Sequence, residues 1–149
     1  MSHSPASGPT HEELLAIFAQ PKTIAVVGAS TAVGVPAHDI PRYLQSQGYR
    51  IVPVNPRGNE ILGVRAFPSL AEVDVPIDVV DVFRPSREAA AVAHQAVAVG
   101  AKVIWFQPGT DTDEAAAIAT EAGLTVIRRR CMGVTHGLLG LGPGPHVPR

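Results

Sequence analysis

The sequence has 149 residues, enough for one domain with its own hydrophobic core. Hydrophobic residues make up 46% and charged residues 17%, which excludes intrinsic disorder, and no apolar run approaches the roughly 18 residues that cross a bilayer. The formal net charge of −1 gives no basic field for nucleic acid or an anionic membrane, and the single cysteine, Cys131, excludes a disulfide framework. With no secretory signal pattern in the polar residues 1–9, we expect a soluble cytoplasmic domain.

The first half of the chain alternates helical and extended patterns. The strand 23–27 is continuously apolar and β-branched, as expected for a strand covered on both faces. In chain order we expect a flexible N-terminus at 1–9, a short helix capped by Thr10, a strand at 23–27, a small-residue loop at 28–34, a helix over about 38–47 and a strand at 49–54.

The second half repeats this alternation, and Gly100 and Gly123 are placed to end two helices. From Gly133 onward the chain is rich in Gly and Pro, which predicts an ordered surface excursion, and we expect a loose tail over 137–149 after a folded domain at 10–136. The expected elements are a turn and short edge strand at 61–67, a helical turn at 69–73, a strand at 77–83, a helix over about 85–99, a strand at 102–106, an Ala-rich helix from Thr110 or Asp111 to Ala122, and a strand at 124–127.

Regular alternation of strand and helix predicts an α/β fold. We expect a Rossmann-like, doubly wound, mostly parallel sheet of about five strands with helices on both faces. Right-handed crossovers place the carboxyl ends of all such strands along one edge, and ligands bind there, in the crevice where the strand order reverses. The residues directly after each strand are therefore the ones to examine for function.

The loop after the first strand runs from Gly28 to Gly34 with small side chains between them. Glycines let backbone N–H groups approach an anion closely, and the following helix N-terminus favours negative charge. A tight turn that needs glycine for packing alone is the alternative, but the position after the first strand favours phosphate contact. The loop matches neither the G-x-G-x-x-G pattern nor a P-loop with its lysine.

The exit of the second strand separates two classes of cofactor. NAD-binding folds place Asp or Glu here to bind the ribose hydroxyls. This sequence has Val54-Asn55-Pro56-Arg57 instead, with no carboxylate before Glu60. The missing carboxylate argues against NAD, and Arg57 indicates a ligand with an additional phosphate, such as NADP or coenzyme A (CoA). A solvated loop arginine is the alternative interpretation of Arg57.

Two later strands end in aromatic residues. Phe83 and Phe106 are placed either to wall an adenine or a pantetheine arm, or to pack in the core. Arg84 is a candidate for a second anion contact, and Gln107 is a candidate to hydrogen-bond an amide. The basic run at 128–130 is most simply a solvated edge.

Four segments together resemble a known family, the small bacterial CoA-binding domain proteins, which are stand-alone relatives of the CoA-binding domain in the succinyl-CoA synthetase α subunit. The resemblance covers about residues 21–136. The segments, which match in order and spacing, are Gly28-Ala29-Ser30, Val54-Asn55-Pro56-Arg57, Val82-Phe83-Arg84 and Trp105-Phe106-Gln107-Pro108-Gly109.

The resemblance implies a domain that binds CoA or an acyl-CoA, with contacts from Thr31 to Gly34, Pro56 to Gly58 and Phe106 to Pro108. The synthetases carry a phosphorylated histidine in a second domain. We expect no second domain here, and none of the six histidines inherits that role, so synthetase activity is not implied. The full set of expected cofactor-binding residues is Gly28, Ala29, Ser30, Thr31, Ala32, Val33, Gly34, Asn55, Pro56, Arg57, Gly58, Phe83, Arg84, Phe106, Gln107 and Pro108.

Catalytic and metal-binding patterns are not visible in the sequence. Cys131 with His136 is the one nucleophile–base pair to consider, and His38 is the other histidine expected to face the crevice. No cluster of Cys, His and carboxylates has metal-ligand spacing. The sequence therefore predicts non-catalytic binding of CoA or an acyl-CoA, without nucleic acid or membrane and with no protein partner identified. The alternatives are an NADP-dependent or acyl-transfer enzyme that uses the same crevice, and a redox-sensing or scaffold module that does not need the ligand.

Overall fold

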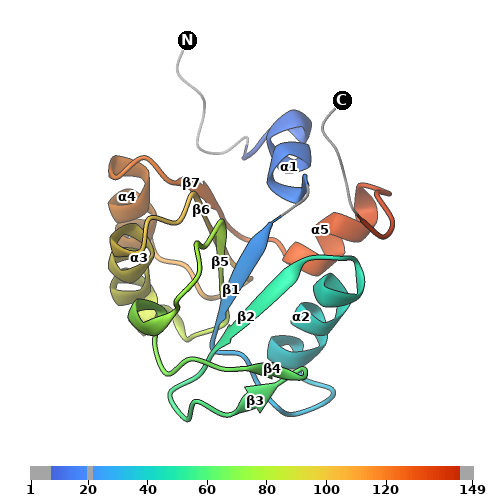
Figure 1. Ribbon diagram of the computed structural model, residues 1–149. Coiled ribbons are helices and arrows are strands. Elements are labelled where there is room, and N and C mark those ends of the chain that lie inside the picture. Colours follow the sequence, from blue (N-terminus) through green and yellow to red (C-terminus); the bar gives the residue numbers. More distant parts are fainter. Residues whose placement is uncertain (1–7, 20–21, 145–149) are drawn as a thin grey trace.

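A parallel five-stranded sheet forms the centre of the computed structural model, which describes residues 8–19 and 22–144 (Figure 1). The strand order is β2-β1-β5-β6-β7, and all four neighbouring pairs are parallel. The predicted doubly wound α/β fold is confirmed. Of the predicted flexible N-terminus at 1–9, residues 1–7 lie outside the described residues. The strands are β1 (Thr23–Val27), β2 (Arg50–Val54), β5 (Val79–Val82), β6 (Val103–Phe106) and β7 (Thr125–Ile127).

Both faces of the sheet are covered, which explains the continuously apolar strands. In β1, Ile24 and Val26 point into one core cluster and Ala25 and Val27 into the other. Figure 1 shows α3 and α4 on one side of the sheet and the other three helices on the opposite side. The helices are α1 (His11–Phe18), α2 (Pro36–Ser46), α3 (Ala89–Ala98), α4 (Asp113–Glu121) and α5 (Met132–Leu138).

A small hairpin follows β2 near its carboxyl end (Figure 1). It consists of β3 (Glu60–Ile61) and β4 (Val64–Arg65), which are antiparallel. Phe67 then forms a parallel bridge with Val54, so the expected edge strand is reduced to one bridge. Two short 3₁₀ turns, η2 (Leu70–Glu72) and η3 (Ser86–Glu88), complete the secondary structure.

Two helices begin a few residues away from the positions expected from the sequence. Helix α2 begins at Pro36, two residues before the expected start, because proline fits the first turn of a helix, where its missing N–H is not needed. The N-cap of α4 is Thr112 rather than Thr110 or Asp111, and its side chain accepts a hydrogen bond from the backbone N–H of Ala115.

Helix α5 is the largest departure from the sequence-based expectation. The region from Gly133 was expected to be a surface excursion, but it forms a helix in which Gly133, Thr135 and His136 are buried. The expected domain boundary after residue 136 lies inside this helix. Leu139 and Leu141, in the expected tail, still pack against the core. The last part of that tail, 145–149, lies outside the described residues.

An aromatic cluster joins α5 to the rest of the fold. The fully buried His136 packs edge-on against the rings of Phe18, Tyr43 and Tyr49, with ring centroids 5.3 to 5.6 Å away. The phenol oxygen of Tyr43 lies 2.8 Å from Nδ1 of His136, which gives the buried ring nitrogen a hydrogen-bond partner. This histidine therefore connects α1, α2 and α5.

Within the described ranges, no helix combines the length and the apolar character that crossing a membrane requires.

The packing of α5 on α2 gives a first prediction. A Cβ at Gly133 would lie 3.1 Å from Cγ2 and 3.3 Å from Cδ1 of Ile40, so Gly133→Val should lower the free energy of unfolding by about 1–3 kcal/mol through overpacking. Gly137→Ala in the same helix should be neutral or stabilising by up to about 1 kcal/mol, because its Cβ meets only the Tyr43 hydroxyl at 3.7 Å. Urea unfolding of both variants checks this. Equal destabilisation by the two substitutions would contradict the packing described.

Candidate functional site

The exits of β1, β2 and β5 meet at the carboxyl edge of the sheet. The N–H of Gly28 donates to the carbonyl oxygen of Val54 over 3.0 Å. Gly28 has a φ of +92°, and a Cβ there would lie 2.8 Å from Cδ of Arg84 and 3.2 Å from the carbonyl carbon of Phe83. Only glycine meets both demands, so this position fixes how closely the exits of β1 and β5 approach.

The following loop presents backbone donors to solvent. Thr31, Ala32, Val33 and Gly34 are exposed, and the N–H groups of Thr31 and Val33 have no hydrogen-bond partner among the described residues. The N-cap of α2, Val35, has no side-chain hydrogen bond, but the N–H groups of His38 and Asp39 donate to its carbonyl oxygen and Pro36 has no N–H. The helix therefore offers an anion its dipole and the N–H of Ala37. This arrangement is suited to contact with phosphate, and the predicted phosphate contact of the glycine loop remains a prediction.

One carboxylate already occupies part of this loop. The Oδ1 atom of Asp39, in the first turn of α2, accepts from the N–H of Gly34 over 3.1 Å and lies 3.1 Å from Nδ1 of His38. The hydrogen bond from Gly34 holds the pKa of Asp39 below its usual range. A bound phosphate at this loop therefore meets an aspartate that competes for one of its donors.

Asn55 connects the loops after β1 and β2. Its Nδ2 donates to the carbonyl oxygen of Ala29, and its Oδ1 accepts from the N–H of Arg57, both over 2.9 Å. An aspartate could not donate to Ala29, which gives a structural reason for the amide at this exit. Arg57 itself is exposed at the rim of the edge, beside the exposed Pro56 and half-buried Gly58.

A cavity of about 220 Å³ lies between these exits and α3. Gly28, Pro56, Arg84 and Glu88 line it together with apolar residues of β1, β2 and η2. The guanidinium of Arg84 is bonded to Glu88 through Nε (3.1 Å) and Nη2 (2.8 Å), which lowers the pKa of that carboxyl. As an anion contact, Arg84 would therefore have to share its charge with Glu88.

The later strand exits separate into buried and exposed positions. Phe106 is fully buried in the cluster beneath α3 and α4, so in this structure it packs in the core and cannot wall a ligand. Phe83 is half-buried and packs partly against the opposite cluster. Pro108 is exposed and lines a separate cavity beside α5. Ser30 is half-buried and Ala29 is buried below the loop.

A carboxylate that sequence reasoning did not select lies beneath this edge. Asp81, in the middle of β5, is fully buried, and its Oδ1 accepts from Nε2 of Gln107 over 2.6 Å. Its Oδ2 has no hydrogen-bond partner. Burial raises the pKa of Asp81 to about 7, with the Gln107 bond opposing that rise. The signal in the sequence was a carboxylate between the valines of the run Val79-Val80-Asp81-Val82.

Gln107 is held by this buried pair. Its side chain is 5% exposed, and its backbone carbonyl accepts from both the N–H (3.0 Å) and the Oγ1 (2.7 Å) of Thr110. With Nε2 bound to Asp81, Oε1 is the amide atom left to accept from a ligand. The predicted role of Gln107 in hydrogen-bonding an amide therefore remains a prediction, now with a defined acceptor atom.

Within the described part of the chain, neither His38 nor His136 is hydrogen-bonded to Cys131, and His11 lines the same cavity as this cysteine. His136 belongs to the aromatic cluster, with its Nδ1 bonded to Tyr43, and His38 is buried with its Nδ1 beside Asp39. Cys131 is half-buried as the N-cap of α5. Among the described residues, no group of three or more His, Cys, Asp and Glu side chains is arranged to hold a metal ion.

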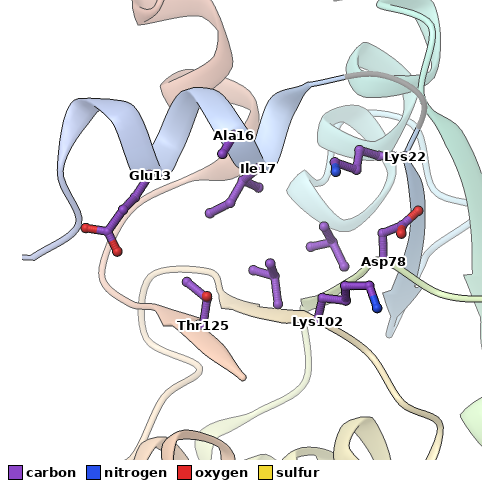
Figure 2. A pocket seen from close by; sticks show the side chains of 9 residues that line it. Glu13, Ala16, Ile17, Lys22, Asp78, Lys102 and Thr125 are labelled. Carbon is purple, nitrogen blue, oxygen red and sulfur yellow. The ribbon is translucent and has the colours of Figure 1, made fainter. Parts of the chain in front are cut away.

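A further cavity of about 230 Å³ lies at the opposite, amino edge of the sheet. Figure 2 shows the two lysines of the chain, Lys22 and Lys102, with Asp78 around it and α1 along one side. Oδ2 of Asp78 accepts from the N–H of Thr23 over 2.7 Å and so fixes the start of β1. Open parallel sheets bind ligands at the other edge, so we assign this cavity no role in binding.

Comparison with known proteins places these features in a family. The family model described as a CoA binding domain matches residues 22–137. An uncharacterized Bacillus subtilis protein, YneT, is 41% identical over 130 residues, which cover 87% of this chain and 96% of that protein. A solved structure of a hypothetical protein from Pyrococcus horikoshii is 38% identical, with a TM-score of 0.87 and coverage of 93% of this chain and 98% of that chain.

More distant similarity extends to CoA ligases. The α subunit of an ADP-forming acetate–CoA ligase from Pyrococcus furiosus is 27% identical over 139 residues, and the match covers 85% of this chain but 30% of that subunit. The chain thus corresponds to less than a third of the ligase subunit. The chain belongs to the CoA-binding domain family, and the family resemblance inferred from the sequence is confirmed.

The buried carboxyl of Asp81 predicts a pH-dependent stability. The pKa is raised in the folded chain from 3.8 to about 7, so between these values the folded state binds more protons than the unfolded state. The free energy of unfolding should therefore fall by a few kcal/mol as the pH rises from about 4 to 7, and level off above. Asp81→Asn should flatten this profile. Urea unfolding at several pH values measures both proteins, and a slope that is unchanged in the variant would contradict the assignment.

Proposed function

We propose that this member of the CoA-binding domain family binds coenzyme A or an acyl-CoA at the carboxyl edge of its sheet, without catalysing a reaction itself. The observation that carries this proposal is the glycine loop after β1. It offers unpartnered N–H groups at the N-terminus of α2, next to a β2 exit that ends in Asn55 rather than a carboxylate. Family membership and the ligase relatives support the same ligand.

The charged end of CoA fits the side of the crevice formed by the exits of β1 and β2. The loop 31–34 and the α2 N-terminus would take the pyrophosphate, and the exposed Arg57 at the rim would take the additional ribose phosphate. The 220 Å³ cavity is smaller than the roughly 300–1,000 Å³ typical of pockets that enclose a whole ligand. CoA would therefore lie extended along the edge, with the pantetheine arm running past Gln107 towards Pro108.

Two carboxylates set the charge that the ligand meets. Asp39 is bonded to the loop N–H of Gly34, and Glu88 is bonded to the guanidinium of Arg84. Phosphate binding would have to displace or share these contacts, so affinity should weaken with added salt and depend on the cations at the rim. This competition favours a ligand with several phosphates over one with a single anionic group.

The alternatives lack a supporting observation. An NADP-dependent or acyl-transfer enzyme needs a general acid or base at the ligand, and the one carboxyl with a pKa near 7, Asp81, is fully enclosed. For a redox-sensing or scaffold module that does not need the ligand, no such observation exists among the described residues either. The cytoplasmic location expected from the sequence remains a prediction.

Arg57 provides the test of this proposal. If it contacts the ribose phosphate, the wild type should bind CoA more tightly than dephospho-CoA, by about 1.5–3 kcal/mol for a well-formed contact and less at this exposed rim. Arg57→Ala should weaken CoA binding and leave dephospho-CoA binding nearly unchanged. Isothermal titration with CoA, dephospho-CoA and NAD measures all three affinities.

The matched control is Arg50→Ala, because Arg50 is an exposed arginine at the start of β2, on the opposite edge of the sheet. It should change none of the affinities. NAD binding as tight as CoA binding would refute the ligand assignment, whereas equal loss of both CoA forms in Arg57→Ala would show that Arg57 contacts a different group.

A further inference from the structure

A further cavity lies beside α5, on the face that also carries α1. Its volume is about 610 Å³, nearly three times that of the cavity between the β1 and β5 exits. Its lining comes from three regions: the first turns of α1, the end of β6 at Pro108, and the segment from Arg129 through α5. Figure 1 shows α1 and α5 on the same side of the sheet.

Four aliphatic side chains form part of the wall of this cavity. Leu14 contributes from α1, Val134 and Leu138 from α5, and Leu139 from the C-cap of that helix. Val134 is 57% exposed and Leu138 is 83% exposed, and they are two of only four large hydrophobic side chains with such exposure in the described residues. The cavity is open to solvent, and its volume of several hundred Å³ is in the range of sites that bind small ligands.

Five residues of the lining have polar side chains, and several of them are engaged in contacts with the protein: His11, Arg129, Arg130, Cys131 and Thr135. Nε of Arg129 lies 3.7 Å from Oδ2 of Asp111, and the neighbouring Arg128 binds the same carboxylate over 2.7 Å. The carbonyl oxygen of Arg130 accepts from the indole of Trp105 over 2.8 Å. These contacts hold the segment after β7 in place. Within α5, Oγ1 of Thr135 donates to the carbonyl oxygen of Cys131 over 2.7 Å, so this hydroxyl is already hydrogen-bonded within the helix.

The position of Pro108 connects this cavity to the proposed CoA crevice. Pro108 follows β6 directly after Gln107, and it is an exposed residue of the cavity wall. A pantetheine arm that runs along the carboxyl edge past Gln107 would thus bring its sulfur end to the mouth of the cavity. A group attached to that sulfur would enter the space between α1 and α5.

We propose that the cavity between α1 and α5 receives the acyl group of an aliphatic acyl-CoA. This inference rests on the proposed function and specifies its ligand: a thioester with a flexible hydrocarbon chain, rather than free CoA. The chain would cover Val134, Leu138 and Leu139 and remove their apolar surface from water, which is the source of the affinity gained.

The test is a chain-length series measured by isothermal titration with CoA and with its acetyl, butanoyl, hexanoyl and octanoyl thioesters. Each methylene that enters the cavity should raise the affinity roughly twofold to fourfold until the space is filled. Val134→Asp should abolish this increase and leave the affinity for free CoA within about twofold. The variant should still fold, because Val134 lies in the first turn of α5, where an aspartate stabilises the helix.

Two further variants complete the design. Leu138→Ser should reduce the chain-length increase in the same way, and it keeps the test valid if Val134→Asp does not fold. Ala117→Asp places an aspartate at an exposed position of α4, on the opposite face, and should leave the whole series unchanged.

The outcomes separate the two proposals. If the wild type binds none of the ligands, the proposed function itself fails. If CoA and all thioesters bind equally, or the increase persists in Val134→Asp and Leu138→Ser, CoA binding stands but the acyl cavity is wrong. If the wild type self-associates without ligand and Val134→Asp abolishes that association, the apolar face belongs to an interface between copies, which also overturns the inference.

Discussion

The candidate site depends on the close contact between the end of β1 and the ends of the two neighbouring strands, β2 and β5. Gly28 donates to Val54 at the end of β2, and its missing side chain leaves room for Phe83 and Arg84 at the end of β5. Asn55 then ties the next turn of the loop to the β2 exit through Ala29. The chain adds β2 on one side of β1 and then β5 on the other, so the strand order reverses at β1. These contacts therefore lie where an open parallel sheet binds its ligand. The loop donors are thus held on a rigid base.

Two of the groups around this base that could bind a phosphate are already bonded to carboxylates. Asp39 and Glu88 each bond to a group that would serve a phosphate, Gly34 and Arg84 respectively. Such pairs keep the cationic and N–H groups ordered before binding, at the cost of competition when an anion arrives. The deeper pair of Asp81 and Gln107 differs, because it is enclosed and orients one amide rather than neutralising a charge at the surface. Charge at the rim and a fixed amide below it suit a ligand with an anionic end and a long amide-bearing arm.

Much of the fold could be predicted from the sequence because the strands are covered on both faces. Apolar β-branched runs such as 23–27 indicate such strands directly, and the exits after them followed from the topology. Helix α5 was missed because its stability comes from tertiary contacts, in which Gly133 allows close approach to α2 and His136 fills an aromatic cluster. The position of Phe106 could not be decided from the sequence either. An aromatic residue at the end of a strand can face the core or the crevice, and the pattern of one strand does not distinguish these two orientations. The pairing of Arg84 with Glu88 and the importance of Asp81 likewise depend on side-chain distances.

The most direct test of the central claim is native mass spectrometry of the purified protein incubated with equimolar CoA, NAD and NADP. Binding at the β1 loop with an amide-bearing arm along the edge predicts one adduct with the mass of CoA, which is lost under denaturing conditions. Adducts of NADP or NAD that equal or exceed the CoA adduct would contradict the assignment of the crevice to CoA, as would the unliganded mass alone.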